Sequence, residues 1–201
     1  MLDIRFNDFT LTGEILSVLI ENCPNVEDLR LERSKMLKDE HFNVLKKLKN
    51  LMYLDVSFTK ISNRTLIGLS ETFRKLKKLE CYGCNNINST GLNKVIDVSP
   101  ELTELSISKS MLTKPLIKSA LASLQKRNNK IDLTICLSAK NDKILAAKIP
   151  DLIKKLGLKS EDYKYSSTSA MRIVYGSSKC NCNFEKTCFC LLGLDTMAYF
   201  G

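Results

Sequence analysis

The sequence predicts an α/β fold, a solenoid in which parallel strands line the concave face and helices lie on the convex face. The first observation is a Leu-x-x-Leu-x-Leu frame that starts at Val26, Leu51, Leu76 and Leu102, in steps of 25, 25 and 26 residues. The second is a helical pattern of apolar residues after each frame. Such a unit can bury its apolar side only against its neighbours, so we expect the units to stack.

A third observation is a small residue at the ninth place of most frames. These residues are Ser34, Thr59, Cys84, Ser110 and Cys136. Where a chain turns away from its strand, buried carbonyl groups need hydrogen-bond donors, and a stacked column of small polar side chains would provide them. The period and the frame together are typical of leucine-rich repeats, so residues 1–136 are predicted to form five or six units of a right-handed βα superhelix, with the weakest frames at Met1 and Asn128.

A helix is predicted after each frame, and most have a residue suited to cap the first turn. In the first unit, the apolar positions between Ile15 and Ile20 indicate a helix that stops at residues 23–25. In the later units the expected helix starts are marked by Asp39, Ser62, Asn88 and Thr113, with Pro115 close to the first helical position.

Beyond residue 136 the repeat pattern ends. Apolar residues between Ile144 and Leu156 predict a helical C-terminal cap over residues 137–158, broken near Pro150. Residues 159–179 are rich in serine, and residues 180–201 form a tail whose composition differs abruptly from the rest. We expect residues 159–201 to be a linker and a poorly ordered tail.

The tail contains four cysteines that could in principle bind zinc: Cys180, Cys182, Cys188 and Cys190. The Cys-x-Cys spacing is tighter than the two to four intervening residues that are usual in structural zinc sites. A disulfide-stapled flank is the other alternative, but the later cysteines are too closely spaced for it. The favoured expectation is that the chain has no metal and no cofactor, with zinc as the minor alternative.

Charge and composition limit the partners. The chain has a net charge of +9, but its basic runs fall near the ends of predicted helices, where cations complement the helix dipole, and no aromatic residues interleave with them. Nucleic acid is therefore not the expected partner, and RNA binding is the third-ranked alternative. No apolar leader or membrane-length apolar run is visible, so a cytoplasmic or nuclear location away from membranes is expected.

Catalysis is not predicted. The single histidine, His41, has no cysteine at a matching place of the frame, and neither a glycine-rich phosphate loop nor a pair of catalytic carboxylates is visible. We expect His41 to have a structural role. The chain is expected not to be an enzyme.

The fourth unit carries a family resemblance. Its residues 83–92 read Gly-Cys-Asn-Asn-Ile-Asn-Ser-Thr-Gly-Leu, and residues 23–25 read Cys-Pro-Asn. Both stretches resemble the cysteine-containing class of leucine-rich repeats, which have a ribonuclease-inhibitor-like fold and are similar to those of F-box proteins. The resemblance implies the substrate-binding part of a receptor in Skp-cullin-F-box ubiquitin ligases. The alternative is a stand-alone adaptor or inhibitor with no ligase role.

The sequence departs from that class in three respects, of which the first is that the Asp after Thr at the helix start is missing throughout. Ser34, Thr59 and Ser110 replace the class cysteine, and no F-box is recognisable before the first repeat. A ligase adaptor is thus expected as a partner only if an F-box lies upstream. Because no polar cap precedes Met1, we expect either part of a longer protein or an irregular cap formed by residues 1–25.

The concave face is the predicted binding site, because alternate side chains of each strand point outward there. Acids outnumber bases on it, and two tyrosines resemble the aromatic anchors of protein interfaces. A protein segment of basic or mixed charge is therefore the expected partner. The predicted site residues are Asp28, Arg30, Glu32, Tyr53, Asp55, Lys78, Glu80, Tyr82, Glu104 and Ser106.

Overall fold

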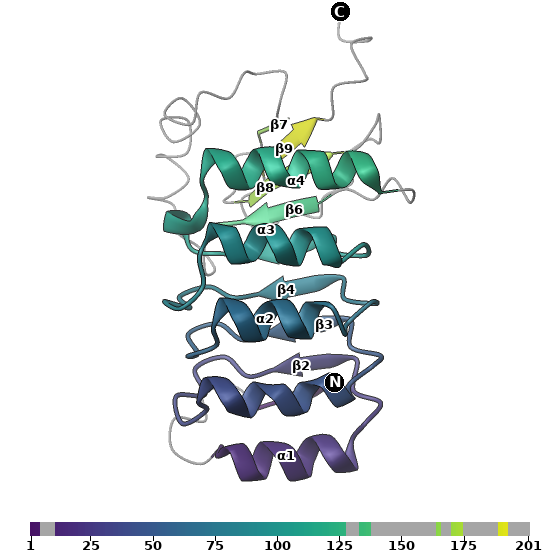
Figure 1. The fold of residues 1–201 in the computed structure, drawn as a ribbon, viewed down its shortest axis with the longest axis vertical. Coiled ribbons are helices and arrows are strands. Elements are labelled where there is room, and N and C mark those ends of the chain that lie inside the picture. Colours follow the sequence, from purple (N-terminus) through teal and green to yellow (C-terminus); the bar gives the residue numbers. More distant parts are fainter. Residues whose placement is uncertain (5–10, 128–132, 138–163, 166–169, 175–188, 193–201) are drawn as a thin grey trace, which may run out of the picture. The chain divides into compact units, whose positions relative to one another are not determined.

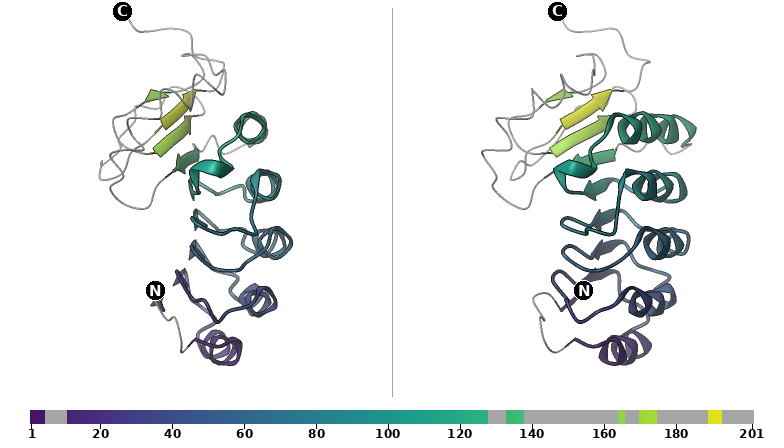
Figure 2. Two further views of the ribbon diagram at one scale, coloured as in Figure 1. Left: turned by 90° about the vertical axis from the view of Figure 1, so that its left-hand side faces the viewer. Right: turned by 60° about the vertical axis from the view of Figure 1, so that its left-hand side comes forward.

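A computed structural model describes residues 1–4, 11–127, 133–137, 164–165, 170–174 and 189–192. The chain divides into two compact units, Met1–Leu102 and Thr103–Gly201. Figures 1 and 2 show an α/β architecture in which strands and helices alternate along the chain up to residue 136. The predicted α/β class is thus confirmed.

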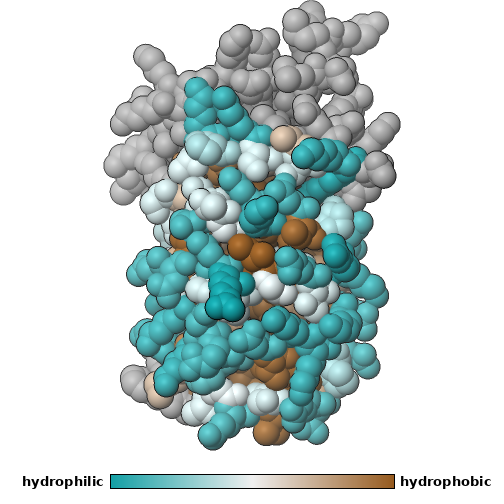
Figure 3. Space-filling model, in the orientation of Figure 1, coloured by the Kyte–Doolittle hydropathy of each residue, from teal (hydrophilic) through white to brown (hydrophobic). Residues whose placement is uncertain are grey.

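In the first unit, four short parallel strands alternate with four helical segments, and the helices cover one side of the sheet (Figure 2). The elements are β1 (Leu2–Asp3), α1 (Gly13–Asn22), β2 (Asp28–Arg30), η1 (Asp39–Lys47), β3 (Tyr53–Asp55), α2 (Asn63–Ser70), β4 (Lys78–Glu80) and α3 (Ser89–Val98). Segment η1 is a 3-10 helix. The helix side of this unit is largely hydrophilic (Figure 3).

The register follows the predicted frame from β2 to β4. Leu29 pairs with Leu54, and Leu54 pairs with Leu79, so each step is 25 residues. All three side chains have no exposed surface. Each buried leucine contributes on the order of 1.5–3 kcal/mol to folding, and this column therefore forms the centre of the core.

The predicted frame is wrong for the first strand by two residues. Leu2, rather than Ile4, pairs with Leu29. A shift of two residues keeps every side chain on its side of the sheet, so Asp3 still lies on the outward side, opposite Arg30.

Three predicted helix starts in the first unit can be compared with the structure. Ser62 and Asn88 cap α2 and α3, each accepting a hydrogen bond from a backbone N–H of the first turn, at 3.3 and 3.1 Å. Asp39 was wrongly predicted as a cap, because η1 begins at that residue. Its carboxylate instead accepts hydrogen bonds from the Ser62 backbone N–H and from the Ser62 and Thr65 hydroxyls, at 2.7–2.9 Å. Asp39 thus connects two successive repeats within the first unit.

The predicted column of small donors is present in the middle of the first unit. Both the Thr59 hydroxyl and the Cys84 thiol donate to the buried carbonyl of Val56, at 2.6 and 3.0 Å. Ser34 is buried, but among the described residues its hydroxyl has no hydrogen-bond partner. The donor role is therefore confirmed for Thr59 and Cys84.

The second unit continues with β5 (Glu104–Ser106), η2 (Lys109–Met111), α4 (Lys114–Lys126) and β6 (Leu133–Cys136), and β5 and β6 are parallel. The Thr113 hydroxyl accepts from the Leu116 N–H at 3.3 Å, which confirms this helix start. Leu105 pairs with Ile135, so the frame predicted from Asn128 is wrong by four residues. The cause is α4, which at 13 residues is longer than α1, α2 or α3.

Two donor positions predicted in the second unit are also wrong. Cys136 lies within β6, opposite Ser106, instead of in the turn after a strand. Ser110 is exposed in η2. Neither residue therefore occupies the buried place that Thr59 and Cys84 share.

Three further strands, β7 (Lys164–Tyr165), β8 (Ala170–Val174) and β9 (Phe189–Leu192), lie within residues 159–201, for which the sequence analysis expects a linker and a poorly ordered tail. Strands β8 and β9 are each antiparallel to β6. The cap predicted over residues 137–158 and most of the tail lie outside the described residues. None of the helices described has the length and apolar character needed to cross a membrane.

Candidate functional site

The strand face of the first unit is the side of β2, β3 and β4 that points away from the buried leucines. Strand pairing places Asp28, Tyr53 and Lys78 in one row across the sheet and Arg30, Asp55 and Glu80 in the next. Glu32, Ser57 and Tyr82 lie two residues after the ends of these strands. The structure therefore places the eight predicted site residues of this unit in or just after the three strands.

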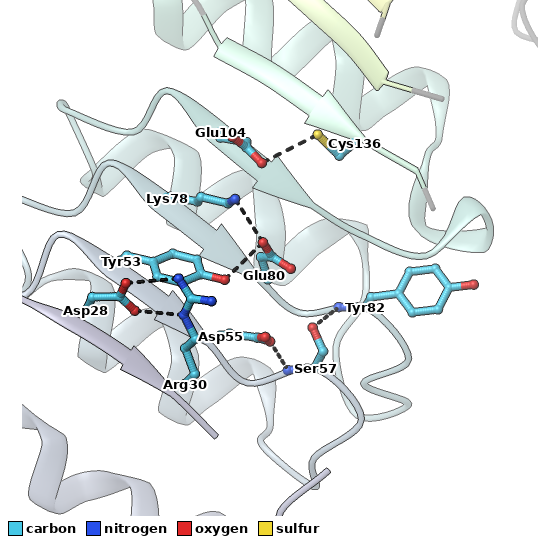
Figure 4. Close-up of polar contacts among 10 residues, drawn as sticks. All are labelled: Asp28, Arg30, Tyr53, Asp55, Ser57, Lys78, Glu80, Tyr82, Glu104 and Cys136. Atoms are coloured by element: carbon cyan, nitrogen blue, oxygen red, sulfur yellow. Dashed lines mark hydrogen bonds and ion pairs between the residues drawn. The ribbon is translucent and has the colours of Figure 1, made fainter. Parts of the chain in front are cut away.

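Tyr53 lies at the centre of the strand face. The Arg30 guanidinium lies 4.8 Å from the centre of its ring, and the Lys78 ammonium lies 5.0 Å from it. The phenol donates a hydrogen bond to Glu80 Oε1 at 3.0 Å (Figure 4). Burial and the neighbouring carboxylates raise the pKa of Tyr53 above its ordinary value, so the hydroxyl remains a donor. Cation–π contacts and the hydrogen bond thus fix this ring in one position.

The charges of the strand face are largely paired with one another. Arg30 binds Asp28 through two nitrogen–oxygen contacts, of 3.1 and 3.0 Å, which raises the pKa of the arginine. Lys78 Nζ lies 3.0 Å from Glu80 Oε1. Asp28 and Glu80 of this face thus already have basic neighbours on the same face.

Asp55 and Ser106 were predicted to point outward but are buried, with 4% and 6% of their surface exposed. The Asp55 carboxylate accepts a hydrogen bond from the Ser57 backbone N–H at 2.9 Å. Burial raises the pKa of Asp55, with a partial offset from this hydrogen bond. Asp55 therefore supports the strand face from within and offers little contact area to a partner.

A second aromatic group borders the strand face at the turns after the strands. The Phe58 and Tyr82 rings meet edge to face at 5.3 Å, and Arg33 lies 4.7 Å from the centre of the Phe58 ring. Figure 4 shows the Tyr82 ring directed away from the Tyr53 group. We call Arg33, Phe58 and Tyr82 the rim cluster. It is the main feature of the site that the sequence reasoning missed.

The backbone of these turns explains the rim cluster. Arg33 and Phe58 have φ values of 62° and 57°, and Gly83 has 68° at the equivalent place. A Cβ on Gly83 would lie 2.4 Å from Phe58 Cδ1. The glycine therefore makes room for the ring. A large side chain at the equivalent position one repeat before a turn glycine is the sequence signal that could have revealed this contact.

The two predicted residues of the second unit are close to each other along β5. Glu104 Oε1 lies 3.8 Å from the Cys136 thiol, and Ser106 pairs with Cys136 across the sheet.

Two chemical features concern the described residues, namely clusters that could hold a metal ion and thiols that could react. Among the described residues no group of three or more His, Cys, Asp and Glu side chains could hold a metal ion. Burial raises the pKa of the Cys81 and Cys84 thiols, which disfavours the nucleophilic thiolate. His41 Nδ1 accepts a hydrogen bond from the Lys38 backbone N–H at 3.0 Å, a structural role of the kind expected.

The zinc alternative falls mostly outside the described residues. Of its four cysteines, the described part of the chain includes only Cys190, within β9, where its backbone lies opposite Lys164 and Arg172. The absence of a metal and of a cofactor stays a prediction.

Comparisons with known proteins inform the fold alone. No protein-family model matches the chain, and no curated protein matches it. Among solved structures, the tropomodulin C-terminal domain from Caenorhabditis elegans is similar, with a TM-score of 0.51 and 14% identity. The match covers 73% of this chain and 94% of that domain. At this identity the likeness supports an α/β fold of repeated strand–helix units and carries no function with it.

Proposed function

We propose that the chain is a non-enzymatic protein-recognition module whose units stack as a right-handed leucine-rich repeat solenoid and whose strand face binds a protein segment. The observation that carries the proposal is the fixed Tyr53 ring between Arg30 and Lys78. Interfaces gain most from aromatic and arginine side chains that lose little conformational freedom on binding. Tyr53 and Arg30 meet that condition.

The proposed ligand is an extended protein segment with basic or mixed charge. Ion pairs such as Asp28–Arg30 and Lys78–Glu80 offer both signs of charge within a short distance. A mixed-charge segment can exchange these contacts without leaving a charge unpaired, which a purely apolar segment cannot do. The aromatic groups then contribute the contact area.

Within this proposal, the chain is the substrate-binding part of an F-box-type ubiquitin ligase receptor in the cytoplasm or nucleus. Support for the ligase role comes only from the resemblance of residues 83–92 and 23–25 to that repeat class. The second candidate is a stand-alone adaptor or inhibitor with the same recognition surface.

A charge-reversal experiment tests the recognition surface. A photo-crosslinking amino acid at Tyr82 is used to capture partners in the wild type, in D28K/E32K/E80K, and in the control E14K/E40K/E71K, whose three residues are exposed. The proposal expects at least tenfold less capture for the strand-face variant and an unchanged level for the control. Equal capture by all three proteins would refute a binding role for the strand face.

A second experiment separates the two candidates. Purified Skp-type adaptor is mixed with this chain and with any longer product of the same gene, and complex formation is measured by gel filtration. A complex with either protein supports the ligase receptor. No complex with either supports the stand-alone adaptor or inhibitor.

A further inference from the structure

Six exposed cations lie at one edge of the first unit, at the end of a helix or between a helix and the next strand. They are Lys46, Lys47, Lys49, Arg74, Lys75 and Lys77, and we call them the basic edge. The first three lie at or just after the end of η1, and the others lie between α2 and β4. This edge is distinct from the strand face and has no part in the function proposed above.

The two halves of the basic edge are adjacent in space. Lys75 Nζ donates a hydrogen bond to Asn50 Oδ1 at 2.8 Å. The Lys77 backbone N–H donates to the Met52 carbonyl, and the Met52 N–H donates to the Glu27 carbonyl, both at 2.8 Å. These contacts stack the segments before β3 and β4 on each other, so the cations of the two segments lie along the same edge of the first unit.

The helix dipole does not account for this charge. Its effect falls off within the last turn of a helix. Arg74, Lys75 and Lys77 come four to seven residues after Ser70, where α2 ends. With Glu71, the Glu21 that pairs with Lys47 and the negative ends of two helices taken into account, about three positive charges remain in excess. The interpretation of these cations as complements of the helix ends therefore fails for half of the patch.

Acidic residues lie beyond both ends of the basic edge. Glu21 and Glu27 lie on the equivalent segment one repeat before it, and Asp97 and Glu101 lie on the equivalent segment one repeat after it. Lys47 contacts Glu21 at 2.7 Å, and Arg74 donates to the Val98 carbonyl at 3.4 Å, so these flanking segments are direct neighbours of the patch. A long polyanion that continued past the patch would meet these carboxylates.

We propose that the basic edge binds a short acidic segment of a partner protein. The patch covers two successive repeats of the first unit. An extended peptide that rises about 3.3 Å per residue would cross it within a few residues. Nucleic acid is the less suitable ligand, because the patch is bounded by acids and has no aromatic residues among its cations for base stacking. Charge complementarity makes an acidic peptide the better match.

Fluorescence anisotropy with labelled octaglutamate tests the proposal on the full chain. The patch variant is K49Q/R74Q/K75Q, and the matched control K60Q/R64Q/K94Q removes the same charge from exposed positions elsewhere in the first unit. We expect affinity to fall at least tenfold in the patch variant and less than twofold in the control. The salt dependence of binding should also become shallower in the patch variant alone.

Three results would overturn the proposal. They are the absence of binding to the wild type, equal loss in both variants, and tighter binding of a 12-nucleotide oligouridine or of phosphatidylserine vesicles than of the peptide through the same residues. A second patch variant, K46Q/K47Q/K77Q, must reproduce the loss of affinity. Because all of the substituted residues are exposed, thermal unfolding of each variant serves as the check that the fold is intact.

Discussion

The inward and outward sides of β2, β3 and β4 follow different rules. On the inward side, the strands place Leu29, Leu54 and Leu79 in one column, and all three are fully buried. On the outward side, the adjacent row across the same strands consists of Asp28, Tyr53 and Lys78, with no residue type repeated. The same backbone thus carries a uniform surface on one side and a varied surface on the other.

The difference shows which residues are constrained by packing. Each inward leucine must fill the space between identical neighbours above and below it, and only a side chain of similar volume does so. Outward residues meet solvent and one another, so their variety is available for recognition. The outward contacts are nevertheless specific, since Tyr53 touches three other side chains of this face.

The largest expected effect comes from a test of the inward side. Leu79→Ala should lower the free energy of unfolding by about 2–5 kcal/mol, because a fully buried leucine leaves a cavity. Lys78 precedes Leu79 and lies on the opposite side of the strand. Lys78→Ala should lower the free energy of unfolding by less than about 1 kcal/mol. Urea denaturation measures both. Equal losses would mean that the two sides do not differ as described.

A smaller loss is expected at the rim cluster. Gly83→Ala should destabilise the chain by about 1–3 kcal/mol, since the residue has a positive φ and its Cβ would contact the Phe58 ring. Part of the loss should be recovered in the double variant Phe58→Ala/Gly83→Ala, where the ring is absent. A double-mutant cycle in urea measures the coupling. Strict additivity would show that the φ angle alone is responsible.

On the strand face itself, Tyr53→Phe should cost about 1 kcal/mol, because it removes the hydrogen bond to Glu80 and leaves the ring between its two cations. Tyr53→Leu removes the cation–π contacts as well and should cost more. Comparison of the two variants by urea denaturation separates the two contributions. A loss for the leucine variant no greater than that for phenylalanine would rule out a role for the cations.

The inward side was predictable from the sequence because its determinants are local. The spacing of Leu54 and Leu79 gave the correct register, and Ser62 and Asn88 gave correct helix starts. Each of these features depends on residues within one repeat or on residues separated by one repeat length. Prediction failed at both ends of the repeat array. There the turn-helix segments vary in length, and a frame carried forward at a constant step loses its register.

The outward side was predictable only as a set of positions. Alternation placed Tyr53 and Glu80 on the correct side, but it could not show that Asp55 is buried beside them or that Phe58 contacts Tyr82. Those features depend on side chains from successive repeats and on a turn with positive φ. Neither is encoded in the spacing of apolar residues.

Asp55 provides the smallest and most specific test of the comparison, because it is an outward residue in a buried environment. Its folded pKa is raised by burial, so the protonated form is favoured in the folded state. The stabilisation from this group is complete below the pKa of the unfolded chain, and it is lost as the pH rises through the folded value. Asp55→Asn retains an acceptor for the Ser57 N–H but cannot ionise. We therefore expect this variant to gain stability relative to the wild type as the pH rises from about 3 to 7, measured by urea denaturation at each pH, whereas a constant difference would show that Asp55 ionises as freely as a solvent-exposed aspartate.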